Sequence, residues 1–316
     1  MYVKTGTYAG NSGTNPITGV GFAPVCMWIK RHGSTSTAAQ VIKTNGVTHT
    51  KLVGFNATTD DTPVTLDSDG FTVLTAAGEV NITGGNYDYI AIGAVAADMA
   101  VFEYAGDGVD NTTVGSFGFT PDLVVVLPSS TVRPAWRSDL MVGDLSHARS
   151  DQAVVANVIQ ALQSGSIQVG TLLNAAGTTY YAAVFKKAAG VLSTAEYTGN
   201  GADNRDIAHG LGVTPTFIYL QSKTVTSQVG VLRFGTDAGD VTHSIISTAD
   251  AANQIQAMGA TNIQVGSSDL VNLTTGSPVY SFFTFADAAP VAGAGGAAVG
   301  GPAESNYDVL RKWRRY

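Results

Sequence analysis

The 316-residue sequence contains one cysteine, Cys26, and few charged residues, which make up 13% of the chain. A single cysteine excludes an intrachain disulfide and favours a reducing compartment, or a particle that is assembled inside a cell. The charged fraction is about half that of an average globular protein.

Long apolar runs are also absent. The most apolar stretch, "YIAIGAVAADMAVF" from Tyr89, is interrupted by Asp98 and is too short to span a membrane. The opening segment "MYVKTGTYAG" has no apolar run of the kind found in signal peptides. These features predict a soluble protein that is made in the cytoplasm and has no membrane partner.

The charge that is present is unevenly distributed. The net charge is −7, but Arg311, Lys312, Arg314 and Arg315 place four basic residues at the very end, so residues 1–305 carry a net charge of −10. A general nucleic-acid binder needs a basic face that displaces counterions from phosphates. The acidic body therefore argues against a nucleic-acid partner.

Glycine is abundant, with 37 residues, and Thr, Ala, Val and Asn are also common. This composition suits turn-rich β structure better than helices, which draw on Glu, Lys, Leu and Arg. Apolar residues make up 44% of the chain, enough to fill ordinary cores. A mainly β fold is the predicted class.

A long motif occurs three times. Each copy begins with Tyr-x-Gly and a polar loop, such as "GNGADN" at 199–204, continues through a Gly-rich hinge to a proline, and enters an apolar strand. Consecutive tyrosines lie 96 and 93 residues apart, and consecutive prolines lie 97 and 94 apart. The repeat-equivalent positions, which we interpret as structural, are Tyr8, Tyr104 and Tyr197, and Pro24, Pro121 and Pro215.

Each copy also has a matching second half, in which Val73, Val169 and Val265 recur at steps of 96 residues before an apolar closing strand. Short apolar runs bounded by Gly, Asn, Asp and Pro are typical of sandwich strands. We predict three tandem β-sandwich or barrel-like domains of about 95 residues, a size that can hold its own core. The predicted boundaries are 1–98 (repeat 1), 99–190 (repeat 2) and 191–288 (repeat 3), followed by a C-terminal tail at 289–316.

The middles of the repeats differ, and short helical connectors are expected there. Residues 150–165 place Val154, Val158, Ile159 and Leu162 on one face of a helix that Ser150 or Asp151 can cap. Residues 247–259 suggest a shorter helix. Residues 58–70 favour a loop because of their Pro, Asp and Thr content.

The tail begins with a Gly/Ala/Pro tract that should act as a flexible linker. Its last residues are basic and aromatic, with an apolar residue at every third position, and Trp, Tyr and Arg dominate binding hot spots. One interpretation is a frayed terminus. We favour a docking peptide for another protein, formed by Tyr307, Leu310, Arg311, Lys312, Trp313, Arg314, Arg315 and Tyr316.

Three histidines recur in register, namely His49, His147 and His243, whereas His32 and His209 have no such partners. Zinc sites use three or four protein ligands, so one histidine per domain cannot hold a metal unless the domains converge on a threefold axis. We interpret the three as structural hydrogen-bonding residues, and no metal or cofactor is predicted.

Calcium binding and the common catalytic motifs find little support in the sequence. The polar loops offer Asp107, Asp110 and Asp203 as calcium ligands, but the first loop has no carboxylate and calcium needs six to eight oxygens, so turns are favoured. No Gly-x-Ser-x-Gly, His-Glu-x-x-His or Cys-x-x-Cys motif occurs. We therefore do not expect an enzyme, and no residue is assigned a catalytic role.

The segments "YTGNGADNRDIAHGLGVTPTFIYLQSK" and "YAGDGVDNTTVGSFGFTPDLVVVL" resemble a module of tailed-bacteriophage virion proteins. That module has a Tyr-Thr-Gly-Asn-Gly loop, then Leu-Gly-Phe-x-Pro-Asp, an apolar strand and often a His near an Arg, as His147 and Arg149 are here. Repeat 3 departs from it with Val213 and Thr216, and repeat 1 lacks the Asp after Pro24. The resemblance covers about a quarter of each repeat and assigns no catalytic residue.

The resemblance implies a virion protein of the tail, neck or capsid surface, made in the host cytoplasm. We expect a structural role, with other virion proteins as partners, homo-oligomers in the particle and the C-terminal peptide as the anchor. The alternative is a tail fibre or head appendage that binds a host receptor or surface glycan. Trp28 and Trp136 are the aromatic residues of the body considered for that role, because flat aromatic rings suit sugars.

Overall fold

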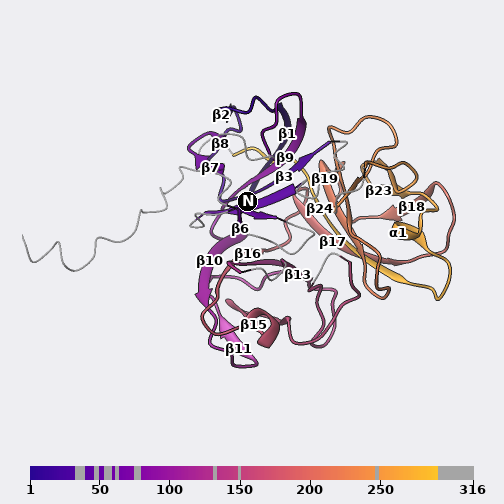
Figure 1. Cartoon of the computed structure of the whole chain (residues 1–316). Coiled ribbons are helices and arrows are strands. Elements are labelled where there is room, and N and C mark those ends of the chain that lie inside the picture. Colours follow the sequence, from indigo (N-terminus) through magenta and orange to yellow (C-terminus); the bar gives the residue numbers. More distant parts are fainter. Residues whose placement is uncertain are drawn as a thin grey trace, which may run out of the picture.

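The structure is a computed structural model that describes residues 1–32, 40–45, 50–52, 59–60, 64–74, 80–130, 134–148, 151–245 and 249–290. It is mainly β, as predicted, and its sheets are antiparallel. Three lobes surround a common centre, and they follow one another in the sequence as the indigo, magenta and orange-to-yellow parts of Figure 1. Each lobe contains one large sheet and one three-stranded sheet.

In repeat 1 the large sheet has the order β1-β9-β3-β4-β5-β6 and the small sheet the order β2-β8-β7. The strands are β1 (Tyr2–Ala9), β2 (Asn15–Thr18), β3 (Cys26–Arg31), β4 (Gln40–Thr44), β5 (Thr50–Leu52), β6 (Thr59–Asp60), β7 (Val64–Asp67), β8 (Gly70–Val73) and β9 (Asn86–Gly93). Part of the loop expected at 58–70 is thus the hairpin of β7 and β8.

In repeat 2 the large sheet has the order β10-β16-β12-β13 and the small sheet the order β11-β15-β14. The elements are β10 (Met99–Ala105), β11 (Thr112–Val114), β12 (Leu123–Pro128), β13 (Ala135–Ser138), β14 (Ile159–Gln163), β15 (Ser166–Val169), the 3₁₀ helix η1 (Thr171–Leu173) and β16 (Thr179–Phe185).

In repeat 3 the corresponding orders are β17-β24-β19-β20-β21 and β18-β23-β22. The elements are β17 (Leu192–Thr198), β18 (Arg205–Ala208), β19 (Phe217–Ser222), β20 (Val231–Phe234), β21 (His243–Ser244), β22 (Ile255–Met258), β23 (Asn262–Val265), the helix α1 (Asp269–Asn272) and β24 (Val279–Phe285).

The helices expected at 150–165 and 247–259 are wrong. The described parts of these segments form turns, bends and isolated β-bridges and lead into β14 and β22. Asn157 and Asn253 have positive φ values of 62°, a turn conformation that ends any helical path. The following strand β14 contains a bulge between Ile159 and Ala161. No helix in the described part of the chain is long and apolar enough to cross a membrane.

Each large sheet has two buried faces. In β24, Tyr280 and Phe282 face the core between the two sheets of repeat 3, whereas Phe283 and Phe285 face a core that all three repeats share. Successive side chains of a strand point to opposite faces, so a strand that is buried on both sides reads as a continuous apolar run. The closing strands therefore look uniformly apolar because their outer face also packs against the other repeats.

The shared core contains equivalent residues from each repeat. Cys26 of β3, Leu123 of β12 and Phe217 of β19 occupy the same place in their sheets, and all three lie in this core. Aromatic contacts cross between repeats within it, such as the 5.5 Å separation of the Trp28 and Phe217 ring centroids. The three lobes thus share an approximate threefold axis within one chain.

The ring of repeats closes between its first and last strands. Val3 and Ala288 exchange two backbone hydrogen bonds, with N···O distances of 3.0 and 2.8 Å. Thr5 adds a bond of 2.8 Å from its backbone N–H to the Asp287 carboxylate. Repeats 1 and 2, and 2 and 3, follow each other directly along the chain, whereas repeats 3 and 1 meet only through non-covalent contacts. We refer to the Val3–Ala288 pairing as the closing seam.

The recurring tyrosines and polar loops form one structural unit. Tyr197 stacks on Tyr280 at 5.3 Å, and the equivalent pairs of repeats 1 and 2 stack in the same way. A buried asparagine then holds the loop: Asn272 accepts the backbone N–H of Asn200 at 2.9 Å and donates to the Ala202 carbonyl at 2.7 Å. Asn81 and Asn174 make the same bonds in repeats 1 and 2.

Replacing Asn272 with alanine should lower the free energy of unfolding by about 2–3 kcal/mol, because buried backbone groups lose their partners. Urea unfolding of the purified chain measures the effect. The matched control is Asn200→Ala, because Asn200 is exposed and its side chain accepts one bond, from the Ala202 N–H. Equal losses in the two variants would show that Asn272 does not organise the loop.

Candidate metal centre

The polar loops are built as turns. Asp107 Oδ1 accepts the Val109 N–H at 2.8 Å and a bond from the Asn174 side chain. The backbone N–H of Val109 is the main cause that lowers the Asp107 pKa. In repeat 3 the Asp203 carboxylate likewise accepts from Asn204 and Gln256. These carboxylates bind the loop itself, and the geometry adds no support for the calcium alternative.

The three recurring prolines occupy equivalent places in the three repeats. The three prolines are buried and each lies two residues before a central strand of a large sheet: Pro24 before β3, Pro121 before β12 and Pro215 before β19. His49 and the eight docking residues of the C-terminal tail, from Tyr307 to Tyr316, lie outside the described residues. Their expected roles stay predictions.

His147 lies between repeats 2 and 3. Its side chain is fully buried, its Nε2 lies 2.9 Å from Ser281 Oγ of β24, and its ring stacks on Trp136 at 4.4 Å. Burial lowers its pKa to about 3, so the imidazole is neutral at pH 7. This environment matches the structural hydrogen-bonding role expected for the recurring histidines.

His243 occupies the same repeat position but has a charged environment. It lies between repeats 3 and 1, with Nδ1 2.7 Å from Asp250 and Nε2 2.8 Å from Asp237. Burial acts to lower the His243 pKa, but the bonds to these two carboxylates outweigh it and raise the pKa to about 9. His209, which has no equivalent, is buried and contacts the Gly259 carbonyl at 3.0 Å.

Two residues of repeat 1 complete a four-residue cluster around His243. His32, just after β3, places Nε2 in close contact with Asp88 Oδ2, and Asp88 lies inside β9. Asp88 Oδ2 is also 3.6 Å from His243 Nε2, and His32 Nδ1 is 4.0 Å from Asp237 Oδ1. One ligand atom from each of His32, Asp88, Asp237 and His243 lies within 4.8 Å of all the others.

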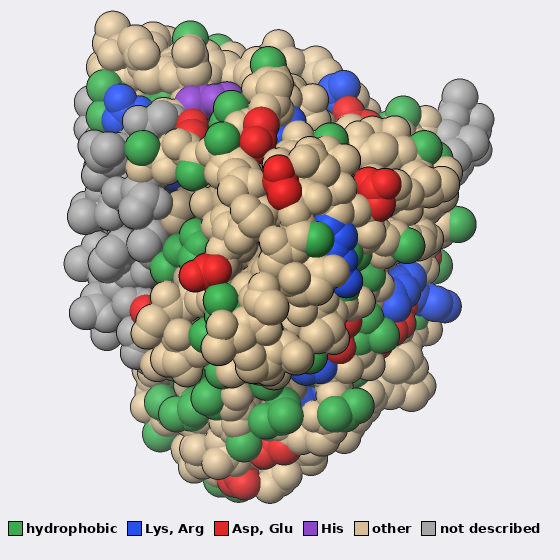
Figure 2. All heavy atoms as spheres, turned by 90° about the vertical axis from the view of Figure 1, so that its right-hand side faces the viewer, with side chains coloured by type: hydrophobic (Ala, Val, Ile, Leu, Met, Phe, Trp, Pro, Cys, Tyr) green, Lys and Arg blue, Asp and Glu red, His purple; other side chains and the backbone are tan. Residues whose placement is uncertain are grey.

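Three side chains of the cluster are buried and one is partly exposed. The side chains of Asp88, Asp237 and His243 are 0% exposed, whereas His32 is 31% exposed. His32 is thus the described histidine that reaches solvent, and histidine surface is visible at the upper edge of Figure 2, next to acidic atoms. The hydrogen bond that the His32 ring donates to Asp88 is the main cause that raises the His32 pKa.

Neighbouring groups orient the cluster. Thr236 donates to Asp88 Oδ1 at 2.6 Å, and the Phe234 N–H donates to Asp237 Oδ2 at 2.7 Å. Arg233 shapes the loop that carries Asp237, because its guanidinium donates to the backbone carbonyls of Asp237, Gly239 and Val241. The remaining atoms, Asp88 Oδ2, Asp237 Oδ1 and His243 Nε2, are thereby turned toward one another.

The interface between repeats 2 and 3 provides an internal comparison. His32 and Lys223 occupy equivalent positions, since each backbone N–H bonds the residue at the start of the closing strand, Asn86 or Val279. Asp88 and Ser281 occupy the same place in their large sheets. Asp237 and Met141 are equivalent because the backbone carbonyl of each accepts a bond from the arginine four residues earlier, Arg233 or Arg137. His243 is equivalent to His147. The second interface therefore retains one ligand of the four.

The sequence contains part of this signal. Asp88 is the one charged residue in the apolar strand "NYDYIAIG", and Lys30 follows the apolar run "CMWI" directly. Lys30 is fully buried, which is the main cause that lowers its pKa to about 8, and Asp250 acts in the opposite direction. Such buried charges mark a special environment. What the sequence does not show is which residues of another repeat they meet.

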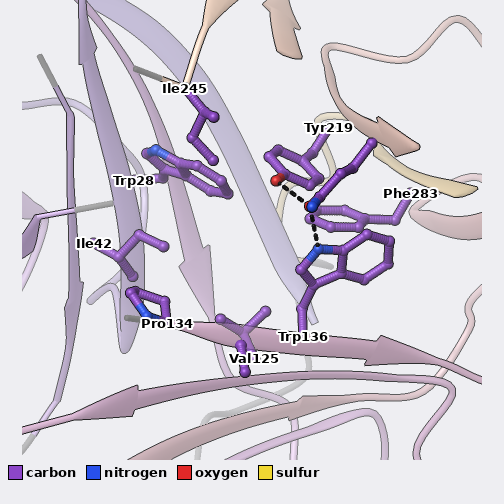
Figure 3. Close-up of a pocket in the computed structure, with 10 residues that line it drawn as sticks. Trp28, Ile42, Val125, Pro134, Trp136, Tyr219, Ile245 and Phe283 are labelled. Carbon is purple, nitrogen blue, oxygen red and sulfur yellow. Dashed lines mark hydrogen bonds between the residues drawn. The ribbon is translucent and has the colours of Figure 1, made fainter. Parts of the chain in front are cut away.

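A second concave feature lies on the threefold axis (Figure 3). It is a mostly apolar pocket in which Trp136 Nε1 and the Tyr219 hydroxyl both donate to Gln221 Oε1, at 3.2 and 2.8 Å. Its walls come from all three repeats and include Trp28, Ile42, Val125, Trp136, Tyr219 and Phe283. Trp28 and Trp136 are thus buried in the shared core, so they do not form an exposed platform for a sugar.

Comparison with known proteins places this architecture in a family. Residues 1–204, well over half of the chain, match the family described as "Domain of unknown function (DUF7483)". The chain belongs to the DUF7483 family. The DUF7483 match takes in repeats 1 and 2 and ends in the polar loop of repeat 3, so it includes His32 and Asp88 but not Asp237 and His243. No curated protein and no solved structure matches the chain.

Proposed function

We propose that the chain is a non-enzymatic structural protein of a tailed-bacteriophage particle, in the tail, the neck or on the capsid surface. The observation that carries this proposal is the closed ring of three β domains around one core. Shared burial of Phe283, Trp136 and Trp28 makes the body a single rigid block rather than three linked binding modules. A rigid block with few charged side chains suits a component that packs against copies of itself and against other virion proteins.

The loop motifs support the same proposal. The Tyr-x-Gly loops that resemble the virion module form matching turns in all three repeats, each held by a buried asparagine and a tyrosine pair. Repetition of a stable turn is expected in a scaffold, where each copy supports the same sheet. It is not expected of a single catalytic site, which needs one particular constellation of residues.

The tail serves as the anchor in this proposal. Ala288, the last residue of the closing seam, lies beside the first strand, so the tail leaves the body at one defined edge. The Gly/Ala/Pro tract then separates that edge from the basic-aromatic peptide, whose positive charge complements an acidic partner surface.

Deleting residues 289–316 should leave the body folded and remove the protein from the particle. The test replaces the gene in the phage that encodes it and measures copies per virion by mass spectrometry, with circular dichroism of the purified variant to confirm folding. The matched control substitutes the 291–301 tract by a Gly/Ser tract of equal length and should keep normal occupancy. Normal occupancy of the deletion variant would contradict the docking role.

The alternative function, binding of a host receptor or surface glycan, can be tested separately with the full chain on a glycan array. Because Trp28 and Trp136 are buried, a sugar site would have to use other side chains. Saturable binding to one glycan class, together with normal particle assembly of a non-binding variant, would favour this alternative over the structural role.

A further inference from the structure

We propose that His32, Asp88, Asp237 and His243 bind one Zn²⁺ ion, which fastens repeat 1 to repeat 3. This goes beyond the proposed function, because it concerns how the ring is held closed, whatever the ring is attached to. Repeat 1 contributes His32 and Asp88, and repeat 3 contributes Asp237 and His243. A bound ion would therefore join the two repeats that no peptide linker connects.

The donor set suits zinc. Imidazole nitrogen and carboxylate oxygen are both zinc ligands at about 2.0–2.2 Å, and structural zinc sites are nearly always tetrahedral with four protein ligands. Four such atoms lie within 4.8 Å of one another here, so small shifts of the side chains bring them to a common centre. Calcium and magnesium prefer sites made of oxygen, and two imidazoles disfavour them.

The surrounding hydrogen bonds hold the four side chains in the orientation that a metal site needs. Histidine ligands almost always give their second nitrogen to a carboxylate or carbonyl, which fixes the ring. His243 does so through Nδ1 to Asp250 at 2.7 Å. The two carboxylates are held by Thr236 and by the Phe234 N–H through their outer oxygens. The inner atoms contact one another, His243 Nε2 with Asp237 Oδ1 at 2.8 Å and His32 Nε2 with Asp88 Oδ2, and a metal ion would replace both contacts.

The charges also balance with a dication. Asp88, Asp237 and Asp250 bring three negative charges into a buried region, and Lys30 supplies one positive charge. Histidine binds zinc as the neutral imidazole, and in that state the region has a net charge of −2, which one Zn²⁺ neutralises in place of the proton that His243 otherwise holds. Buried charges are costly unless they are paired or coordinate a metal.

The comparison between interfaces shows that the cluster is not a general consequence of the repeat. The equivalent positions between repeats 2 and 3 hold Lys223, Ser281, Met141 and His147, a set that cannot bind zinc. Metal ligands occur at the interface where the chain has no covalent connection. The ion would hold repeats 1 and 3 together, as the peptide linkers hold the repeats together at the other two interfaces.

Zinc content and zinc binding of the intact chain test the proposal. The protein is stripped with chelator, titrated with Zn²⁺ in a calorimeter, and titrated with Co²⁺ to record the visible bands of tetrahedral cobalt. We expect one ion per chain and tetrahedral Co²⁺ bands. His32→Gln should weaken binding at least tenfold, and this variant should fold because His32 is partly exposed. Asp88→Asn removes a second ligand and should weaken binding further.

The matched control is Lys223→Gln, which changes the equivalent residue at the other interface and should bind zinc like the unaltered chain. Absence of one-to-one zinc binding in the unaltered chain would overturn the proposal. So would binding that His32→Gln leaves equally tight, because the ion would then be held elsewhere. Cobalt bands of octahedral type, with several waters, would also contradict a closed four-ligand site.

Discussion

Replacing Phe283 with alanine is expected to lower the free energy of unfolding by about 3–5 kcal/mol, the range found when a buried phenylalanine is truncated. Phe283 lies in β24 and is 3% exposed, in the core that all three repeats share. Its ring meets Trp136 of repeat 2 at 5.3 Å in an edge-on arrangement. The cavity would therefore weaken the contact between repeats, and we expect one cooperative transition that shifts as a whole.

Urea unfolding followed by tryptophan fluorescence measures this effect, since Trp28 and Trp136 both report on the shared core. A double-mutant cycle between Trp136 and Phe283 should give a coupling energy of about 0.5–1.5 kcal/mol. The control cycle pairs Trp136 with Phe71, which lies in the separate core of repeat 1, and should be additive. Two separate transitions, or equal coupling in both cycles, would contradict a shared core.

The second large effect is a loss of folding stability at acidic pH that depends on His147. Burial lowers the His147 pKa to about 3 from 6.5, while the Gln152 carbonyl acts to raise it and Lys223 to lower it. A group whose folded pKa is depressed stabilises the fold above its unfolded pKa and loses that stabilisation as the pH falls. The unfolded chain takes up the proton first, so the contribution of His147 should fall by about 2 kcal/mol between pH 7 and pH 5.

The measurement is the free energy of unfolding at several pH values for the unaltered chain and for His147→Gln, whose amide can still bond Ser281. Subtracting the two curves removes the contributions of other titrating groups, including His32 and His243. We expect the difference between the curves to narrow as the pH falls from 7 to 5. A difference that stays constant over this range would show that His147 titrates normally.

The repeats and most strands could be predicted from the sequence because their signals are local. Tyr197, Pro215 and Val265 recur in register, and the apolar runs between them end at glycines and asparagines. The two expected helices were wrong for a local reason as well: Asn157 has a positive φ, and the strand that follows it contains a bulge between Ile159 and Ala161. Apolar spacing alone does not distinguish a bulged strand from a helix.

The candidate metal centre could not be predicted in the same way. His32 and His243 are 211 positions apart and meet only because repeat 3 packs against repeat 1. Counting one recurring histidine per domain missed His32, because the equivalent position of repeat 3 holds Lys223 and not a histidine. The charge of Asp88 within an apolar strand was a sequence signal, but its partners in repeat 3 could be identified only from the packing of repeat 3 against repeat 1.

The closing seam also explains why the three repeats need not unfold independently of one another. Lys4 and Thr5 of β1 both reach Asp287, and Thr216 donates to the same carboxylate at 2.9 Å. Residues from both ends of the body thus converge on one acidic side chain. The body should consequently resist local opening at this edge more than an unsealed terminus would.

The closure of the ring is the central claim, and an engineered disulfide across the seam tests it most directly. Val3 and Ala288 form a hydrogen-bonded antiparallel pair, whose Cα atoms should lie about 5.5 Å apart, within disulfide range. Val3→Cys with Ala288→Cys, in a Cys26→Ala background, should oxidise within the chain and migrate faster on a non-reducing gel. A Val3→Cys, Ala188→Cys control should not. Failure of the seam pair to cross-link, or cross-linking only between chains, would contradict the closed ring.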